Sequence, residues 1–125
     1  MQVKAQAKQL RIAPRKLGLV AGLVRGRSVA DALVILEHTP KRGAKLLREV
    51  VKSAQANADH NHQLPTKELR IDQILVSPGG IIKRYHLASR GSVMPINKRL
   101  SNVTVLIEAP DTTAATKAKT AGEKN

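Results

Sequence analysis

The chain has 125 residues, of which 22 are Lys or Arg and 9 are Asp or Glu, so its formal net charge is +13. This length suits one domain and leaves no room for a second core. The absence of Cys excludes disulfide scaffolds and thiolate metal sites. No apolar run approaches the roughly 18 residues of a membrane span, and the first residues lack the apolar segment of a secretory signal. We therefore expect no membrane partner.

The positive charge is concentrated in two stretches that contain no acidic residue. Residues 1–30 hold seven basic side chains and residues 73–107 hold five, whereas the segment between them is nearly balanced. Such a distribution attracts polyanions, and nucleic acid is the commonest polyanion in a cell. A charge that served solubility alone would be mixed in sign. The charge pattern therefore predicts a nucleic-acid-binding protein.

The first 26 residues predict a strand followed by a helix. Apolar and polar residues alternate over residues 3–8, which predicts a strand with one wet face. Pro14 suits the first position of a helix, and Gly26 suits its C-terminal end, with Arg25 facing the negative pole of the helix dipole. Gly18 and Gly22 lie four apart inside this helix, where each costs stability. They indicate either tight packing against another helix or close contact with RNA.

Two further helices are predicted between residues 28 and 61. Ser28 with Asp31 three residues later forms an approximate capping box for the first of them. Thr39-Pro40 predicts the start of the other, with Thr39 as its N-cap, and that helix runs to about Asn61. Its apolar stripe consists of Ala44, Leu47, Val51, Ala54 and Ala58.

A second stripe on the same helix is basic. Its side chains lie within about 60° of one another around the helix axis, where like charges repel mildly. Phosphates lying against the stripe would explain it, although a solvated face is the alternative. The stripe consists of Lys41, Lys45, Arg48 and Lys52.

The C-terminal half predicts two strands joined by a long excursion. Residues 69–76 read as a strand with one break in its alternation, and residues 103–108 read as another. If Ile74 pairs near Val105, residues 77–100 form a hairpin that turns at Ser89-Arg90 and extends about 30 Å beyond the sheet. An isolated basic ribbon is marginal in water, so we expect a crevice of folded RNA to order it, and a floppy surface loop is the alternative. The tail at residues 110–125 lacks periodicity and is predicted to be disordered.

Little in the sequence indicates catalysis. His60 and His62 beside Asp59 superficially resemble a nuclease site, but His and Asn are also ordinary residues at a helix C-terminus. No further ligands with plausible spacing appear, so we expect no catalytic residue, metal or cofactor. Tyr85 is the single aromatic residue, and it cannot form a stacking platform for bases. We therefore expect the chain to recognise the phosphates, the 2′-hydroxyls and the overall shape of a structured RNA.

Four segments together resemble the bacterial type of the large-subunit ribosomal protein 22 family. They are RIAPRKLGLVAGLVRG (11–26), NADHN (57–61), IKRYHLASRGSVMPINKR (82–99) and SNVTVLIE (101–108). The resemblance covers roughly residues 3–108 and implies an α+β fold, in which three helices pack on a small three-stranded antiparallel sheet with a long protruding β-hairpin. Residues 1–109 would form a single globular RNA-binding domain.

The resemblance also implies a function without enzymatic activity. A family member is a structural constituent of the large ribosomal subunit in the cytoplasm, binds 23S-type ribosomal RNA and supports subunit assembly. Its hairpin lines the nascent-polypeptide exit tunnel. The implied partners are large-subunit ribosomal RNA, neighbouring large-subunit proteins and the nascent polypeptide, with no homo-oligomer.

Candidate RNA-binding residues come from both lines of reasoning. The charge pattern nominates Lys4, Lys8, Arg11, Arg27, Lys41, Lys45, Arg48 and Lys52. The resemblance implies contacts by Arg15, Lys16, Arg25, His60, Asn61, Lys83, Arg84, Arg90, Lys98 and Arg99, and a tunnel-lining tip formed by Ala88, Ser89, Arg90, Gly91 and Ser92. Many relatives carry Pro-Arg where Leu87-Ala88 stand here, and a basic residue at Ser92 and Pro95, so this tip is less basic than usual.

Two other classes of function remain open from the sequence. A DNA-architectural protein would share the charge, but duplex DNA offers no enclosing cavity for a long ribbon. A preference for folded ribosomal RNA over duplex DNA at matched salt separates the two. A small nuclease would show metal-dependent cleavage that is lost when His60 and His62 are both substituted.

Overall fold

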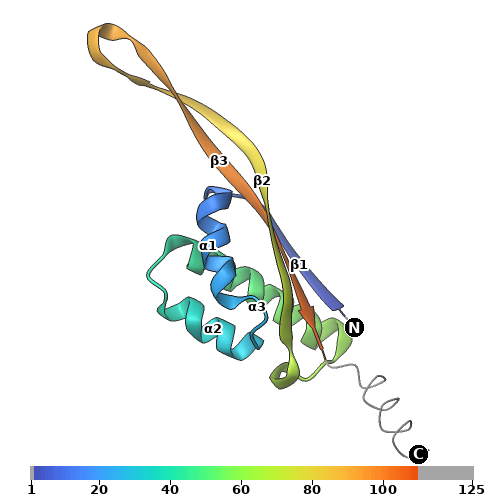
Figure 1. The fold of residues 1–125 in the computed structure, drawn as a ribbon. Coiled ribbons are helices and arrows are strands. Elements are labelled where there is room, and N and C mark those ends of the chain that lie inside the picture. The colour runs from blue at the N-terminus through green and yellow to red at the C-terminus, as the bar shows by residue number, and fades with distance from the viewer. Residues whose placement is uncertain (1, 110–125) are drawn as a thin grey trace, which may run out of the picture.

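The computed structural model describes residues 2–109, so the tail predicted at 110–125 lies outside the described residues. The elements in chain order are β1 (Gln2–Leu10), α1 (Pro14–Val24), α2 (Val29–His38), α3 (Arg42–His62), the 3₁₀ turn η1 (Thr66–Glu68), β2 (Arg70–Leu87), the 3₁₀ turn η2 (Ser89–Gly91) and β3 (Val93–Glu108). The strands form an antiparallel sheet in the order β1-β3-β2. The three helices lie on one face of this sheet, and β2 and β3 continue past it as a hairpin (Figure 1). The expected α+β fold is confirmed.

The strand register agrees with the sequence pattern. Ile74 pairs with Val105, as predicted. The break in alternation is a β-bulge, because Ile71 pairs with Ile107 whereas Gln73 pairs with Leu106, so that two steps along β2 match one along β3. The bulge keeps both Ile71 and Ile74 on the buried face.

The core is aliphatic and lies between the helices and the sheet. Leu17, Leu36 and Leu47 from the helices meet Ile71 and Ile107 from the strands in one cluster of buried residues. The apolar stripe predicted on α3 is confirmed, since all five of its residues are buried. With no Phe or Trp in the chain, many small aliphatic contacts hold the fold together.

Two predicted helix starts are confirmed. Pro14 is the first residue of α1, where its missing N–H costs nothing. Ser28 is the N-cap of α2, and its hydroxyl accepts a hydrogen bond from the Asp31 backbone N–H at 3.3 Å.

The predicted role of Thr39 as the N-cap of the third helix is wrong. Thr39 instead ends α2, where its hydroxyl donates a hydrogen bond to the Ile35 carbonyl at 2.6 Å. Helix α3 begins later, at Arg42, after Lys41. Pro40 restricts Thr39 to extended backbone in either role, but a hydroxyl can donate as well as accept. Here the Thr39 hydroxyl donates, because the last carbonyls of α2 have no partner within their own helix.

The two helical glycines of α1 do not serve packing within the described chain. A Cβ atom at Gly18 or Gly22 would have no neighbour within 4 Å, so tight helix packing is the wrong alternative for them. Gly43 of α3 does lie in a close helix contact, since a Cβ there would lie 3.4 Å from both Leu17 Cδ1 and Val20 Cγ2 of α1.

Replacing Gly18 or Gly22 with Ala should therefore stabilise the isolated protein. We expect the free energy of unfolding to rise by roughly 0.5–1 kcal/mol at each site, because Ala loses less backbone entropy in a helix. Gly26→Ala is the matched control and should destabilise, since Gly26 has a φ of +76°. Urea unfolding measures all three, and destabilisation by Gly18→Ala would show that its surroundings are not open.

The hairpin is a continuous two-stranded ribbon. It runs from the Ile81–Arg99 pair to the Leu87–Val93 pair. The turn at Ser89–Gly91 is confirmed, with φ values of +59° at Arg90 and +74° at Gly91. The Ala88 N–H closes the turn by donating to the Ser92 carbonyl at 2.7 Å. Side chains of the ribbon between Lys83 and Arg99 are exposed throughout, apart from half-buried Ala88 in the turn.

Shortening the hairpin should leave the rest of the protein folded. Replacing residues 82–98 with Asn-Gly joins the Ile81–Arg99 pair through a two-residue turn. Because no residue removed belongs to the buried cluster, we expect cooperative thermal unfolding within a few degrees of the full chain. Loss of cooperative unfolding would show that the hairpin contributes to the core.

Candidate nucleic-acid interface

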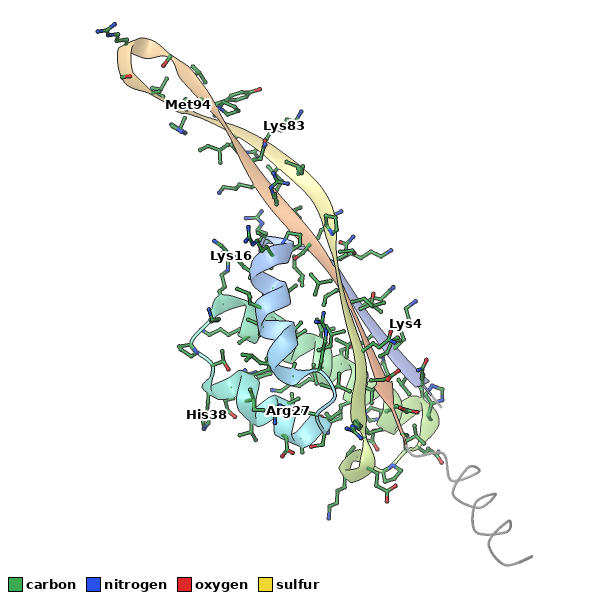
Figure 2. All side chains as sticks on the ribbon, in the orientation of Figure 1. Lys4, Lys16, Arg27, His38, Lys83 and Met94 are labelled. Carbon is green, nitrogen blue, oxygen red and sulfur yellow. The ribbon has the colours of Figure 1, made fainter. Side chains whose placement is uncertain are left out.

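Basic side chains follow β1 into the start of α1. Lys4, Lys8 and Arg11 are exposed along and after the strand, and Arg15 and Lys16 are exposed in the first turn of α1. Figure 2 shows Lys4 on β1, and Lys16 at the end of α1 nearest the hairpin. The structure therefore brings the basic N-terminal segment up to the base of the hairpin.

Two of the predicted RNA-binding arginines also donate hydrogen bonds to backbone carbonyls of the fold. Arg25 donates from Nε and Nη2 to the Ile74 carbonyl at 3.2 and 2.9 Å, instead of facing the end of its own helix. Arg27 donates from Nε to the Leu23 carbonyl at 3.0 Å. Each guanidinium keeps further N–H donors. Sequence spacing could not reveal the Arg25 contact, since Ile74 lies 49 positions away.

The basic stripe of α3 faces outward along most of its length. Lys45 and Lys52 are exposed, Arg48 is half-buried, and Lys41 precedes the helix as its N-cap. Among the residues that the structure describes, Arg48 Nε is buried without a hydrogen-bond partner. The stripe is thus a row of cations beside a core-facing apolar row.

His60 and Asn61 lie exposed in the last turn of α3. The helix ends at Gln63, which has a φ of +52° and donates its backbone N–H to the Ala58 carbonyl. Within residues 2–109, no group of three His, Asp or Glu side chains could hold a metal ion. In the same part of the chain, no helix is long and apolar enough to cross a membrane.

The distal hairpin carries apolar side chains that sequence reasoning missed. Residues that pair across antiparallel strands point to the same face. The Tyr85–Pro95 and Leu87–Val93 pairs therefore form an apolar face near the tip. Tyr85 is 69% exposed and Leu87 is 81% exposed. The expected basic ribbon therefore also has an apolar face. Its residues could be assigned only from the strand register beyond the shift between Pro78 and Ile81, which the sequence did not reveal.

The other face of the hairpin is mixed. The Ile82–Lys98, Arg84–Ile96 and His86–Met94 pairs alternate basic or imidazole side chains with aliphatic ones. Near the sheet this face meets the first turn of α1 and forms a hollow of about 550 Å³. Six basic residues line the hollow: Arg11, Lys16, Arg42, Arg84, Lys98 and Arg99. Arg99 pairs with Ile81, so its side chain belongs to the opposite face of the ribbon. Arg42 was not among the predicted contacts, because it does not belong to the predicted basic stripe and only the structure places it beside the hairpin.

Comparison with known proteins agrees with this arrangement. Residues 5–108 match the family described as ribosomal protein L22p/L17e. Proteins described as large ribosomal subunit protein uL22 from Lacticaseibacillus casei and Lacticaseibacillus paracasei are each 48% identical to the chain over 103 residues, which is 82% of this chain and 88% of theirs. The chain therefore belongs to the ribosomal protein L22p/L17e family, whose members are structural and not enzymatic.

Proposed function

We propose that this chain is a structural constituent of the large ribosomal subunit that binds its ribosomal RNA and supports subunit assembly. We also propose that its hairpin lines the nascent-polypeptide exit tunnel of the cytoplasmic ribosome. Family membership supports the first part. The hairpin supports both parts, because a ribbon without a core of its own needs surroundings that cover it.

The hairpin is suited to insertion between RNA segments. Its β2 arm runs from Ile81 to Leu87 and extends roughly 23 Å at about 3.3 Å per residue, and the hairpin contains no acidic residue. Lys83, Arg84, Lys98 and Arg99 can neutralise phosphates on both sides of the ribbon, since Lys83 and Arg84 are adjacent in β2 and point to opposite faces. The apolar face begins only beyond them, at Tyr85.

The tip is suited to contact with a polypeptide. Ala88, Ser89, Arg90, Gly91 and Ser92 form a small turn with a single charge. Small side chains leave room in a narrow channel, and the neighbouring Leu87 and Val93 offer weak apolar contact to a passing chain. We propose that one copy of the protein acts in this way, through residues 1–109 as one RNA-binding domain.

Competition binding tests the RNA partner. We expect purified protein to bind large-subunit ribosomal RNA at least tenfold more tightly than duplex DNA of equal nucleotide content at matched salt, because RNA crevices enclose both faces of the hairpin. Equal affinities would favour the DNA-architectural alternative.

Photo-crosslinking tests the tunnel contact. A photoreactive amino acid at Ser89, in the turn, should crosslink to nascent chains on translating ribosomes. The same residue at Val34, exposed on α2, is the control. Crosslinks from Val34 but not from Ser89 would contradict the tunnel role while leaving RNA binding intact.

A further inference from the structure

The basic hollow lies where the helical body meets the base of the hairpin. Arg11, Lys16 and Arg42 line it from the helical body, and three cations line it from the hairpin: Arg84, Lys98 and Arg99. None of the described residues that line it is acidic. Like charges that converge in this way repel one another unless an anion lies between them.

The hairpin leaves the body at a narrow joint next to the hollow. The Gly80 N–H donates to Gln9 Oε1 at 3.0 Å, and the Gln9 N–H donates to Asn102 Oδ1 at 2.9 Å. The strand register shifts at the same level, between Pro78 and Ile81. Farther out, the side-chain hydrogen bonds of Arg84 and Ser92 end within the hairpin. The direction of the hairpin therefore depends on this joint and on what occupies the hollow.

The size of the hollow favours more than a single small ion. Its 550 Å³ falls within the range of about 300–1,000 Å³ that holds drug-sized ligands. Arg and Lys donors bind phosphate oxygens with charge-assisted hydrogen bonds. Ile12, Ile82 and Leu100 also line the hollow and can contact the apolar edge of a ribose.

We propose that the hollow binds neighbouring phosphates of one bent RNA segment and so fixes the angle between hairpin and body. This inference rests on the proposed RNA-binding function. The bound phosphates bridge cations of the body and cations of the hairpin. In the free protein the same cations repel, so the hairpin samples a wider range of angles before the RNA binds.

Inorganic pyrophosphate tests the site without RNA. In NMR titrations we expect saturable shifts of the backbone amides near residues 11–16, 82–84 and 98–100. Arg42→Gln, on the body, and Lys98→Gln, on the hairpin, should each weaken this binding about tenfold or more, through the loss of a charge-assisted contact. Lys67→Gln removes the same charge from exposed η1 and should leave the affinity unchanged. Unsaturable shifts at all basic segments, or equal losses in the three variants, would overturn the proposal.

Distance measurements test the coupling to hairpin direction. The chain has no Cys, so Ser53→Cys on α3 and Ser92→Cys at the tip allow two spin labels to be placed. We expect the distance distribution to narrow when the protein binds large-subunit ribosomal RNA. The distribution should stay broad in the Arg42→Gln/Lys98→Gln double variant at equal RNA saturation. Equal narrowing in both proteins would refute the proposal that phosphates in the hollow fix the hairpin angle. It would leave the proposed RNA binding intact. Failure of the unsubstituted protein to prefer this RNA over DNA would instead refute the proposed function.

Discussion

Reversing the charge of the α3 stripe should lower affinity for large-subunit ribosomal RNA about a thousandfold at moderate salt. Four lost phosphate contacts reduce the slope of log affinity against log salt by roughly 3–4, since each contact contributes about 0.7–0.9. The new carboxylates also repel phosphates. The substitutions are Lys41→Glu, Lys45→Glu, Arg48→Glu and Lys52→Glu. Filter binding over a range of salt concentrations measures both quantities.

Two controls make the result interpretable. Lys67→Glu reverses one exposed charge outside the stripe and should leave the salt slope nearly unchanged. Circular dichroism should show that the fourfold variant keeps its helices, because Lys45 and Lys52 are exposed and only Arg48 is half-buried. A folded fourfold variant with an unchanged slope would show that the stripe faces solvent.

Truncating Leu47 should have the largest effect on stability. Leu47 is fully buried at the contact of α3 with the core, so Leu47→Ala removes apolar contacts and leaves a cavity. We expect the free energy of unfolding to fall by about 3 kcal/mol. Leu19→Ala is the same substitution at a side chain that is 65% exposed on α1, and it should change stability by less than about 0.5 kcal/mol. Urea unfolding measures both, and similar losses would contradict the assigned core.

Local patterns predicted most of the fold because the core is simple. The period of 3.6 residues in α3 and the period of two in β3 each mark one buried face, and no aromatic residue obscures them. The pairing of Ile74 with Val105 followed from matching the two apolar strands. That single register then placed the turn at Ser89–Gly91.

The errors arose where a residue's partner lies outside its own segment, or where one residue can act in two ways. Arg25 is bound to the Ile74 carbonyl across the fold, which spacing along α1 does not indicate. Thr39 stands between two helices and serves the one before it. The hollow at the hairpin base depends on three segments meeting, so Arg42 could be recognised only in the structure.

The sequence predicted the positive charge of the candidate site but not the arrangement of its side chains in space. Acid-free stretches marked the hairpin and the N-terminal segment as polyanion-binding. The apolar face at Tyr85 and Leu87 depends on which residues pair across the ribbon. This face lies between the basic part of the hairpin, which is suited to RNA, and the tip, which is suited to a polypeptide. The count of charges did not distinguish these two parts.

Sedimentation of cell lysate at raised salt tests the central claim most directly, with the protein followed across the gradient by immunoblotting. We expect it to migrate with large subunits in stoichiometric amount and to remain there as salt increases, because the hairpin is enclosed by RNA and not merely held by surface charge. Release into the light fractions, or migration with DNA, would contradict an integral role in the large subunit.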